Sequence, residues 1–502
     1  MKNAFKIINF ILIIFCITFT LLAANKHQGN TYYYLTFSLL INALFIYTLN
    51  SKSLFFEIYL ALFVWLGFWF KYTLSLVFLN GIIYDSGLDK NMLNIDKAIL
   101  TSIIAILSIF LCFVFRRIVF VEKIYEINEK SFFEKVYLNN KRKVIFLFII
   151  IFSIIAISNF NFNIYQRGFI YEHKITFVIV NFIKWMLLFG LTTFSCFFIY
   201  TDILRLKKVS LFIIVVAFME IFLSYTSMLS RAAIMNLSTV TFSLTKYLDF
   251  IKNKKFFIIF IPIFIVFIFL LNNYISNKVR INHADEIGSY ILAKEAKTKA
   301  LGESKWKDYT ELKKKNLTHF KVSNSAGVRP DPINMSIFVL INRWVGIESM
   351  IAVVSSNNLS FGLLFQSFKE RKITKKKTFY ETTFKVDWDG GKEVLLGEKR
   401  VLKGNTLPGI ISFLFYTGNY YFLFISIFIL VFIFSLFEIL CKKISNNNMI
   451  FSSFISFMIS FRLFNFGYVP KESYLFFASV LLSALLIFIL SKSKFYFLNK
   501  RK

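Results

Sequence analysis

The sequence predicts an all-α polytopic membrane protein with about twelve transmembrane helices and one large loop. Hydrophobic residues make up 57% of the 502 positions, and apolar runs of 18 or more residues recur along the chain. Each such run can cross a hydrocarbon core of roughly 30 Å. The net charge of +31 comes from cations between the apolar runs. This distribution is typical of membrane topology and argues against a nucleic-acid-binding domain.

The expected spans follow one another with short polar connections. In chain order they lie near Phe5–Ala23, Tyr32–Thr48, Leu54–Leu79, Ala98–Phe120, Val144–Ser158, Ile175–Tyr200, Leu211–Ser227, Ala232–Phe250, Phe256–Leu271, Pro408–Leu440, Met449–Phe466 and Tyr474–Leu490. The first run lacks a small-residue cleavage site and precedes further spans, so we interpret it as a retained helix. All four cysteines lie within or at the ends of apolar runs, which argues against a disulfide framework.

The spans divide the chain into a first block of about nine helices (1–274), a loop (275–406) and a C-terminal block of about three helices (407–502). Clusters such as Arg116–Arg117 and Lys442–Lys443 fall in alternate connections. By the positive-inside rule, both termini are cytoplasmic and the loop is extracytoplasmic. The expected location is the cell inner membrane, with multiple passes.

The large loop carries 24 Lys and Arg against 14 Asp and Glu, a net charge of +10. Asp285–Lys315 predicts a charged helix, and Val386–Val394 predicts a β-hairpin with its turn at Asp389-Gly390-Gly391. The apolar run Ser336–Ser356 is long enough to cross the membrane. A crossing there would place the later basic clusters outside, so we expect an interfacial or re-entrant helix.

Five arginines among apolar residues are candidates for binding an anionic substrate. They are Arg231 and Arg343, then Arg280, Arg462 and Arg167, and all lie on the outer side in this topology. A guanidinium stays charged at any relevant pH and matches phosphate oxygens with two parallel hydrogen bonds. Snorkelling membrane anchors are the alternative interpretation of each.

Glu348 is the candidate general base. It follows Arg343 by five residues, about 140° around a helix, so the two side chains would flank a groove. Apolar surroundings would raise the pKa of its carboxyl into a useful range. A structural salt bridge is the alternative, and Asp331, His283 and His173 are weaker candidates. Lys71, Lys184 and Glu220 fall inside spans, where we expect ion pairs within the bundle or a polar cavity.

Several common catalytic motifs are missing from the sequence. It contains no GxxxxGK[ST], GxGxxG, HExxH or GxSxG, and no His/Cys/Asp cluster at ligand spacing. We therefore expect no cofactor and no catalytic metal.

The chain resembles the bacterial oligosaccharide repeat-unit polymerases, the O-antigen polymerase (Wzy-type) family. The resemblance rests on the many spans, the large late loop and three short stretches: LSRAAIMNL around Arg231, NRWVGIES, and TLPGIISFLFYTGNYYFLF (Thr406–Phe424). The RX10G pattern of some members is absent from this chain.

This resemblance implies a GT-C-like membrane glycosyltransferase that joins undecaprenyl-diphosphate-linked repeat units into O-antigen or capsule at the outer face of the membrane. An acceptor hydroxyl attacks the anomeric carbon of the donor, and undecaprenyl diphosphate leaves. Arg231 and Arg343 would stabilise the diphosphate charge without a metal, with help from Arg280, Arg462 and Arg167, and Glu348 would take the proton. The implied partners are the lipid-linked oligosaccharide, the bilayer and a chain-length regulator protein.

Three alternatives stay open at this point. An O-antigen ligase uses the same donor with a different acceptor. A polyprenyl-phosphate-sugar glycosyltransferase typically has an acid in its first outer loop; Ala24–Thr31 has none, but Asp85 and Asp89 follow in the second. A flippase or transporter would show duplicated halves or matching broken helices, and neither is visible.

Overall fold

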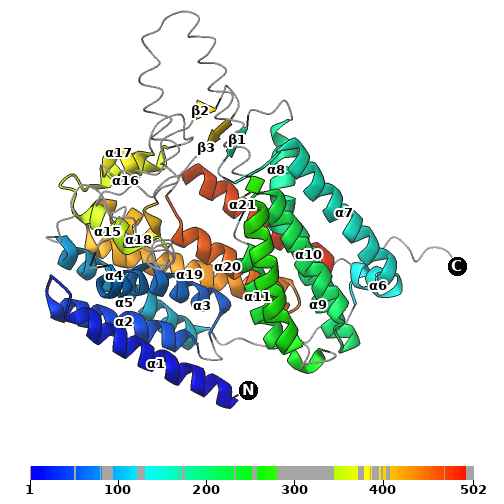
Figure 1. Ribbon diagram of the computed structural model, residues 1–502, viewed down its shortest axis with the longest axis horizontal. Coiled ribbons are helices and arrows are strands. Elements are labelled where there is room, and N and C mark those ends of the chain that lie inside the picture. Colours follow the sequence, from blue (N-terminus) through cyan, green and yellow to red (C-terminus); the bar gives the residue numbers. More distant parts are fainter. Residues whose placement is uncertain are drawn as a thin grey trace, which may run out of the picture.

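The computed structural model consists almost entirely of helices. It describes residues 2–49, 53–79, 81, 94–120, 130–167, 169–171, 176–230, 233–251, 257–276, 278–279, 344–370, 378–384, 386, 395–396, 400–402, 407–467 and 470–492. Figure 1 shows these helices as one bundle, with the strands at its upper edge.

The first block holds α1 (Lys2–Ala24), α2 (Thr31–Thr48), α3 (Phe55–Val64), η1 (Trp65–Phe70), α4 (Lys71–Phe78), α5 (Ile95–Val119), α6 (Phe132–Asn139), α7 (Lys141–Phe162), α8 (Phe177–Trp185), η3 (Met186–Gly190), α9 (Leu191–Thr201), η4 (Asp202–Leu206), α10 (Leu211–Ser227), α11 (Ala233–Thr245) and η5 (Leu248–Phe250). An unlabelled helix follows at Phe257–Ser276. The later part holds α15 (Ile347–Val354), α16 (Phe361–Phe368), α17 (Phe379–Thr383), α18 (Gly409–Leu414), η8 (Phe415–Thr417), α19 (Tyr420–Ile444), α20 (Met449–Phe464) and α21 (Pro470–Lys492).

Seven helices in the described part of the chain are long and apolar enough to cross a membrane. They are Phe55–Phe78, Ile95–Val119, Lys141–Phe162, Val178–Leu206, Phe257–Ser276, Tyr420–Ile444 and Glu472–Lys492. Shorter apolar helices lie at Asn9–Ala24, Leu211–Ser227 and Met449–Phe464. The expectation of a helical polytopic membrane protein is therefore confirmed, while the count of twelve spans stays a prediction.

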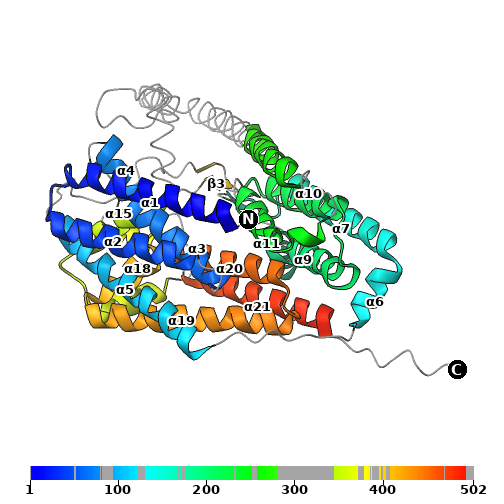
Figure 2. The ribbon, with the colours of Figure 1, turned by 90° about the horizontal axis from the view of Figure 1, so that it is seen from below.

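Helices from the first and last blocks of the sequence pack directly against one another. α20 lies along α3, and α19 lies along α5. The hydroxyl of Ser108 on α5 donates a hydrogen bond to the carbonyl of Phe424 on α19 at 2.6 Å. Figure 2 shows the same arrangement, with α1, α2, α5 and α19 at one side, α7, α9, α10 and α11 at the other, and α20 and α21 between them.

The helices alternate in direction, so the bundle has two ends. At one end the connection after α1 meets the start of α5, where the Asn30 amide donates to both carboxylate oxygens of Asp96 at 2.9 and 3.0 Å. α15 lies at this end, which we call the Glu348 end. At the other end the guanidinium of Arg116, near the end of α5, pairs with Glu57 near the start of α3. We call it the Arg116 end.

The predicted span Pro408–Leu440 is wrong at its start. The chain forms the short α18 and η8, breaks at Gly418 with φ +69°, and begins α19 at Tyr420. Asn419 caps the new helix, because its side chain accepts a hydrogen bond from the Phe422 amide at 3.0 Å. A positive φ is tolerated by glycine, so Gly418 ends one helix and permits the next.

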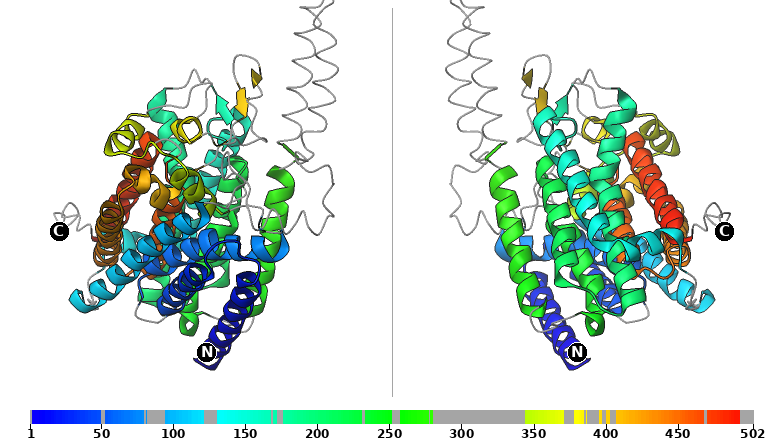
Figure 3. Two further views of the ribbon diagram at one scale, coloured as in Figure 1. Left: turned by 90° about the vertical axis from the view of Figure 1, so that its left-hand side faces the viewer. Right: turned by 90° about the vertical axis from the view of Figure 1, so that its right-hand side faces the viewer.

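A small antiparallel sheet joins the first block to the large loop. β1 (Phe169–Tyr171) pairs with β3 (Arg400–Leu402), which also pairs with β2 (Leu395–Leu396). Figure 3 shows these strands at the edge of the molecule, beyond the helices. β1 was not predicted. The predicted hairpin lies outside the described residues apart from Val386, and β2 and β3 form the antiparallel pair that follows it.

Candidate functional site at the Glu348 end

Three of the six predicted site residues lie within the described chain, and all three are at the Glu348 end. Glu348 is on α15, Arg167 follows α7, and Arg462 is in the last turn of α20. Arg231, Arg280 and Arg343 lie outside the described residues, as do His173, His283 and Asp331.

Glu348 forms a buried ion pair with Lys71. The Lys71 ammonium lies 2.9 Å from Oε1 of Glu348, and the two side chains are 2% and 9% exposed. Lys71 also donates to the carbonyl of Trp344 at 2.9 Å. The sequence predicted an ion pair for Lys71 and a structural salt bridge as one interpretation of Glu348. It did not predict that these two residues would be partners.

Two glycines allow this pair to form. A Cβ on Gly67 would lie 1.9 Å from the Val345 carbonyl oxygen, and a Cβ on Gly346 would lie 2.2 Å from the Gly67 carbonyl oxygen. Only glycine permits such close backbone contact. Gly67 is inside η1, a π-helical turn that ends directly before Lys71. π-Helical turns are frequent at functional sites, because the extra residue redirects side chains.

The second oxygen of Glu348 is the unusual feature of this pair. Oε1 accepts the Gly346 amide at 3.2 Å as well as the Lys71 ammonium. Oε2 is buried and has no hydrogen-bond partner among the described residues. Burial raises the pKa of Glu348, and Lys71 lowers it by a smaller amount. The carboxyl therefore holds a proton more tightly than a free glutamate and has one oxygen able to accept it.

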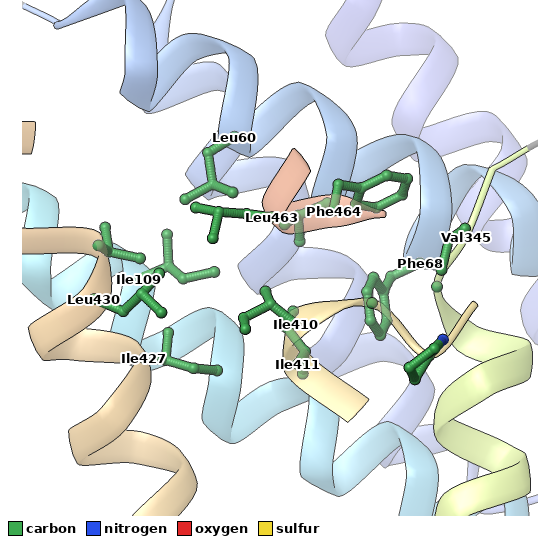
Figure 4. A pocket seen from close by; sticks show the side chains of 15 residues that line it. Leu60, Phe68, Ile109, Val345, Ile410, Ile411, Ile427, Leu430, Leu463 and Phe464 are labelled. Carbon is green, nitrogen blue, oxygen red and sulfur yellow. The ribbon is translucent and has the colours of Figure 1, made fainter. Parts of the chain in front are cut away.

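An apolar cavity lies next to this pair, but it cannot hold a charged group. Its volume is about 20 Å³, and Gly346 and Phe464 are among its lining residues. Figure 4 shows Leu60 and Phe68 from the helix Phe55–Phe78 converging on it with Ile109 from α5 and Ile427 from α19. A diphosphate would find no polar side chain in this lining. The cavity therefore belongs to helix packing.

Lys184 and Arg462 form a cationic cluster with the start of α21. The Lys184 ammonium lies 3.3 Å from the Glu472 carboxylate and 4.9 Å from the centre of the Tyr165 ring. Nε of Arg462 donates to the hydroxyl of Ser473 at 3.1 Å, and its guanidinium lies 5.6 Å from the Phe476 ring centre. Because Glu472 and Ser473 are consecutive, one turn of α21 positions both cations.

Arg167 extends this cluster toward α10. Its amide donates to the Met228 carbonyl at 2.9 Å, and its guanidinium lies 5.7 Å from the Tyr225 ring centre. Tyr165, the residue that faces Lys184, lies two positions earlier in the same segment. Ser230, the neighbour of Arg231, donates its amide to the Tyr225 carbonyl at 2.9 Å. The described residues that follow α10, up to Ser230, therefore lie near Arg167.

The cluster brings three cations and three aromatic rings to one end of the bundle. Arg167, Lys184 and Arg462 come from three different elements and are all partly exposed. Guanidinium and ammonium groups at such positions can bind phosphate oxygens, and the rings can stack on sugars or contact a lipid chain. The described residues contain no group of acids, histidines and cysteines that could hold a metal ion.

The last turn of α20 separates the cationic cluster from the Glu348–Lys71 pair. Arg462 faces α21, whereas the Phe461 and Phe464 rings pack on Phe63 at 5.8 and 5.5 Å. The edge of the Phe464 ring also lies against Gly67. The two clusters thus flank one helix end, although the sequence predicted a direct Arg343–Glu348 groove.

The structure contains a polar cluster around His27 that we did not predict from the sequence. Nδ1 of His27 and the hydroxyl of Tyr72 share a hydrogen bond of 2.7 Å, and Nε2 lies 3.6 Å from Asp96. Burial lowers the pKa of His27, and Asp96 partly offsets this effect. The only signal was a histidine in the polar connection after the first span. Its partner Asp96 is 69 residues away, so the pairing required the fold.

Comparison with known protein families, with curated proteins and with solved structures found no match to this chain.

Proposed function

We propose that the protein is a membrane glycosyltransferase that polymerises oligosaccharide repeat units carried on undecaprenyl diphosphate, at the extracytoplasmic face of the inner membrane. The observation that carries the proposal is the convergence of Arg167, Lys184 and Arg462 at the end of the bundle that also holds Glu348. Under the positive-inside topology predicted from the sequence, this end faces outward.

The cationic cluster would stabilise the leaving group. As the glycosidic bond to the donor breaks, negative charge develops on the diphosphate oxygens, and fixed cations near the hydrocarbon boundary lower the energy of that charge. The aromatic rings of Tyr165, Tyr225 and Phe476 would contact the sugars and the first isoprene units. Arg231, Arg280 and Arg343 remain proposed members of the same site on the grounds of sequence.

Glu348 would accept the proton of the attacking hydroxyl through Oε2, the oxygen without a described hydrogen-bond partner. The acceptor oxygen then forms the new bond to the anomeric carbon, and undecaprenyl diphosphate leaves with the electron pair. Lys71 would hold Oε1 and keep the carboxylate oriented. A raised pKa makes Glu348 a stronger base than a solvated glutamate.

The test is extension of a purified lipid-linked repeat unit by the protein in nanodiscs. Wild-type protein should give a ladder of products, and Arg462→Gln and Arg167→Gln should each lower turnover about 10²–10³-fold, the range for loss of one charge-stabilising donor. Lys492→Gln at the opposite end is the matched control and should keep wild-type turnover. Wild-type ladders from both arginine variants would overturn the assignment.

The same assay separates the alternatives. A ligase would transfer the glycan to a lipid A core acceptor and form no ladder from repeat units alone. A flippase would move labelled lipid-linked repeat unit across a vesicle membrane without forming a new glycosidic bond.

A further inference from the structure

The short helix α16 carries an apolar stripe that the described residues leave largely open. Phe361, Phe365 and Phe368 are 46%, 64% and 37% exposed, whereas Leu364 and Ser367 on the opposite side are 3% and 2% exposed. The three rings are at positions i, i+4 and i+7, so they lie along one face of the helix.

A second, polar stripe runs beside the phenylalanines. Gln366 and Lys369 are both exposed and follow Phe365 and Phe368 by one position each. One residue corresponds to about 100° of rotation around a helix. The helix therefore has an inward face, an exposed aromatic face and an exposed polar face, which is the pattern of a helix at a membrane interface.

The contacts of α16 place it across the ends of the spanning helices. The Ser360 amide donates to the Tyr416 carbonyl at 2.9 Å, and Phe361 packs on Phe422 at the start of α19, at 5.1 Å. At its other end, Phe368 packs on Phe413 of α18, also at 5.1 Å. α16 also touches α21. Figure 3 shows this yellow-green helix at the outer edge of the bundle, beside the red α21.

The aromatic stripe is continuous with lipid-facing surface on the neighbouring helices. On α19, Tyr421, Ile425, Ile429 and Ile433 are 83%, 55%, 51% and 55% exposed at every fourth position. Tyr474 near the start of α21 is 51% exposed. Exposed tyrosines at the ends of apolar helices are typical of the boundary between acyl chains and headgroups. α16 lies at that same level.

We propose that α16 is an interfacial helix that binds the surface of the bilayer, with Phe361, Phe365 and Phe368 among the outer acyl chains and with Gln366 and Lys369 at the phosphates and water. Lys369 carries the charge that complements phosphate. The proposal depends on the spanning helices and is independent of the proposed enzymatic activity.

The test is collision accessibility of single nitroxide labels in lipid nanodiscs. Phe365→Cys and Gln366→Cys are labelled in the full chain, with Ile429→Cys as the lipid-facing reference. All four native cysteines are buried, and labelled wild-type protein gives the background. Oxygen concentrates in lipid and a soluble nickel chelate concentrates in water. We expect the label at 365 to collide mainly with oxygen and the label at 366 mainly with the chelate.

Three outcomes would overturn the proposal. Preference for the chelate at both positions would place α16 in water, above the bilayer. Preference for oxygen at both positions would place it inside the hydrocarbon. A label at 365 that meets neither reagent would mean that protein covers the stripe. Chain extension by both labelled variants is measured in parallel. If extension is retained while one of these three outcomes is found, the interfacial placement of α16 is wrong and the proposed function is unaffected.

Discussion

The two ends of the helix bundle differ in the exposure of the carboxylates that pair with cations. At the Arg116 end, buried carboxylates have cationic partners: Glu57 pairs with Arg116, Glu134 with Arg205, Asp202 with Lys141, and Glu438 with Lys442. Glu438 also accepts the amides of Phe55 and Phe56 at the start of α3, at 3.1 and 2.6 Å. These pairs connect helices to one another and cap helix ends.

Cations contact aromatic rings at both ends, as Arg117 does with Tyr47 at 3.8 Å, and Glu348 pairs with Lys71 in the same buried way. The Glu348 end differs in the exposure of its other ion pair. Arg167, Lys184 and Arg462 each lie near an aromatic ring and are partly exposed, and the carboxylate of Glu472 beside Lys184 is 46% exposed. Groups in such surroundings can exchange a contact for a ligand oxygen at little cost. Under the proposed function, the Arg116 end stabilises the fold and the Glu348 end binds the ligand.

The largest expected effect at the Glu348 end comes from Glu348→Gln. Loss of a general base lowers turnover about 10²–10⁴-fold. Burial raises the pKa of Glu348, so its carboxyl takes up a proton at a higher pH than a free glutamate does. Wild-type turnover should therefore begin to fall at pH values that are still above the ordinary glutamate pKa of about 4.3. Rates of chain extension between pH 4 and pH 9 measure both effects.

Glu220→Gln is the matched control for that variant. Glu220 is buried like Glu348, but its carboxyl accepts hydrogen bonds from the hydroxyls of Thr192 and Ser224 at 3.3 and 3.1 Å. Within the described part of the chain, Glu220 contacts hydroxyls and no cation, which fits the polar surroundings expected as the alternative to an ion pair. Glutamine can accept one of these hydrogen bonds and donate its amide to the other hydroxyl, so turnover should not change. Equal losses from both variants would contradict a specific role of Glu348.

The next effect is on stability and should appear mainly at the Arg116 end. Arg116→Gln leaves the buried Glu57 without its main partner, which costs about 3–5 kcal/mol of unfolding free energy. Arg462→Gln should change stability much less while it lowers turnover. Thermal unfolding in nanodiscs measures the difference between the two variants. A larger stability loss from Arg462→Gln than from Arg116→Gln would contradict the claim that the Arg116 end contributes more to stability.

A smaller effect is expected from Glu472→Gln. The carboxylate is 46% exposed and pairs with Lys184 at 3.3 Å. Exposed pairs contribute about 0–1 kcal/mol, so unfolding should change by no more than that. Turnover should be retained, because Lys184 keeps its charge. A stability loss as large as that of Arg116→Gln would show that the two ends do not differ in kind.

The smallest effect concerns His27. Burial lowers the pKa of its imidazole in the folded state, so the folded protein favours the neutral ring that faces Tyr72, Tyr34 and Asp96. Unfolding stability should therefore be fully present above the unfolded-state pKa of about 6.5 and should decrease as pH falls through the folded-state pKa. His27→Gln should flatten this part of the stability profile, and an unchanged profile would contradict the prediction.

Hydropathy was enough to predict the spanning helices, because lipid requires long apolar segments whatever their partners are. It failed at Gly418, where one glycine conformation ends a helix inside a continuous apolar run. Charged residues within apolar runs were useful signals, because each of them makes a specific polar contact in the structure. These residues are Lys71, Lys184, Glu348 and Arg462. Their partners were not predictable, because Lys71 and Glu348 are 277 positions apart and meet only through the close approach of Gly67 and Gly346.

The central claim is that cations from separate helices at the Glu348 end bind a lipid-borne diphosphate. Native mass spectrometry of the protein with a polyprenyl diphosphate, and with the corresponding monophosphate as reference, tests this claim directly. We expect wild-type protein to retain the diphosphate in preference to the monophosphate, and Arg167→Gln/Arg462→Gln to lose that preference. Equal retention of the diphosphate by the wild type and the double variant would contradict the account.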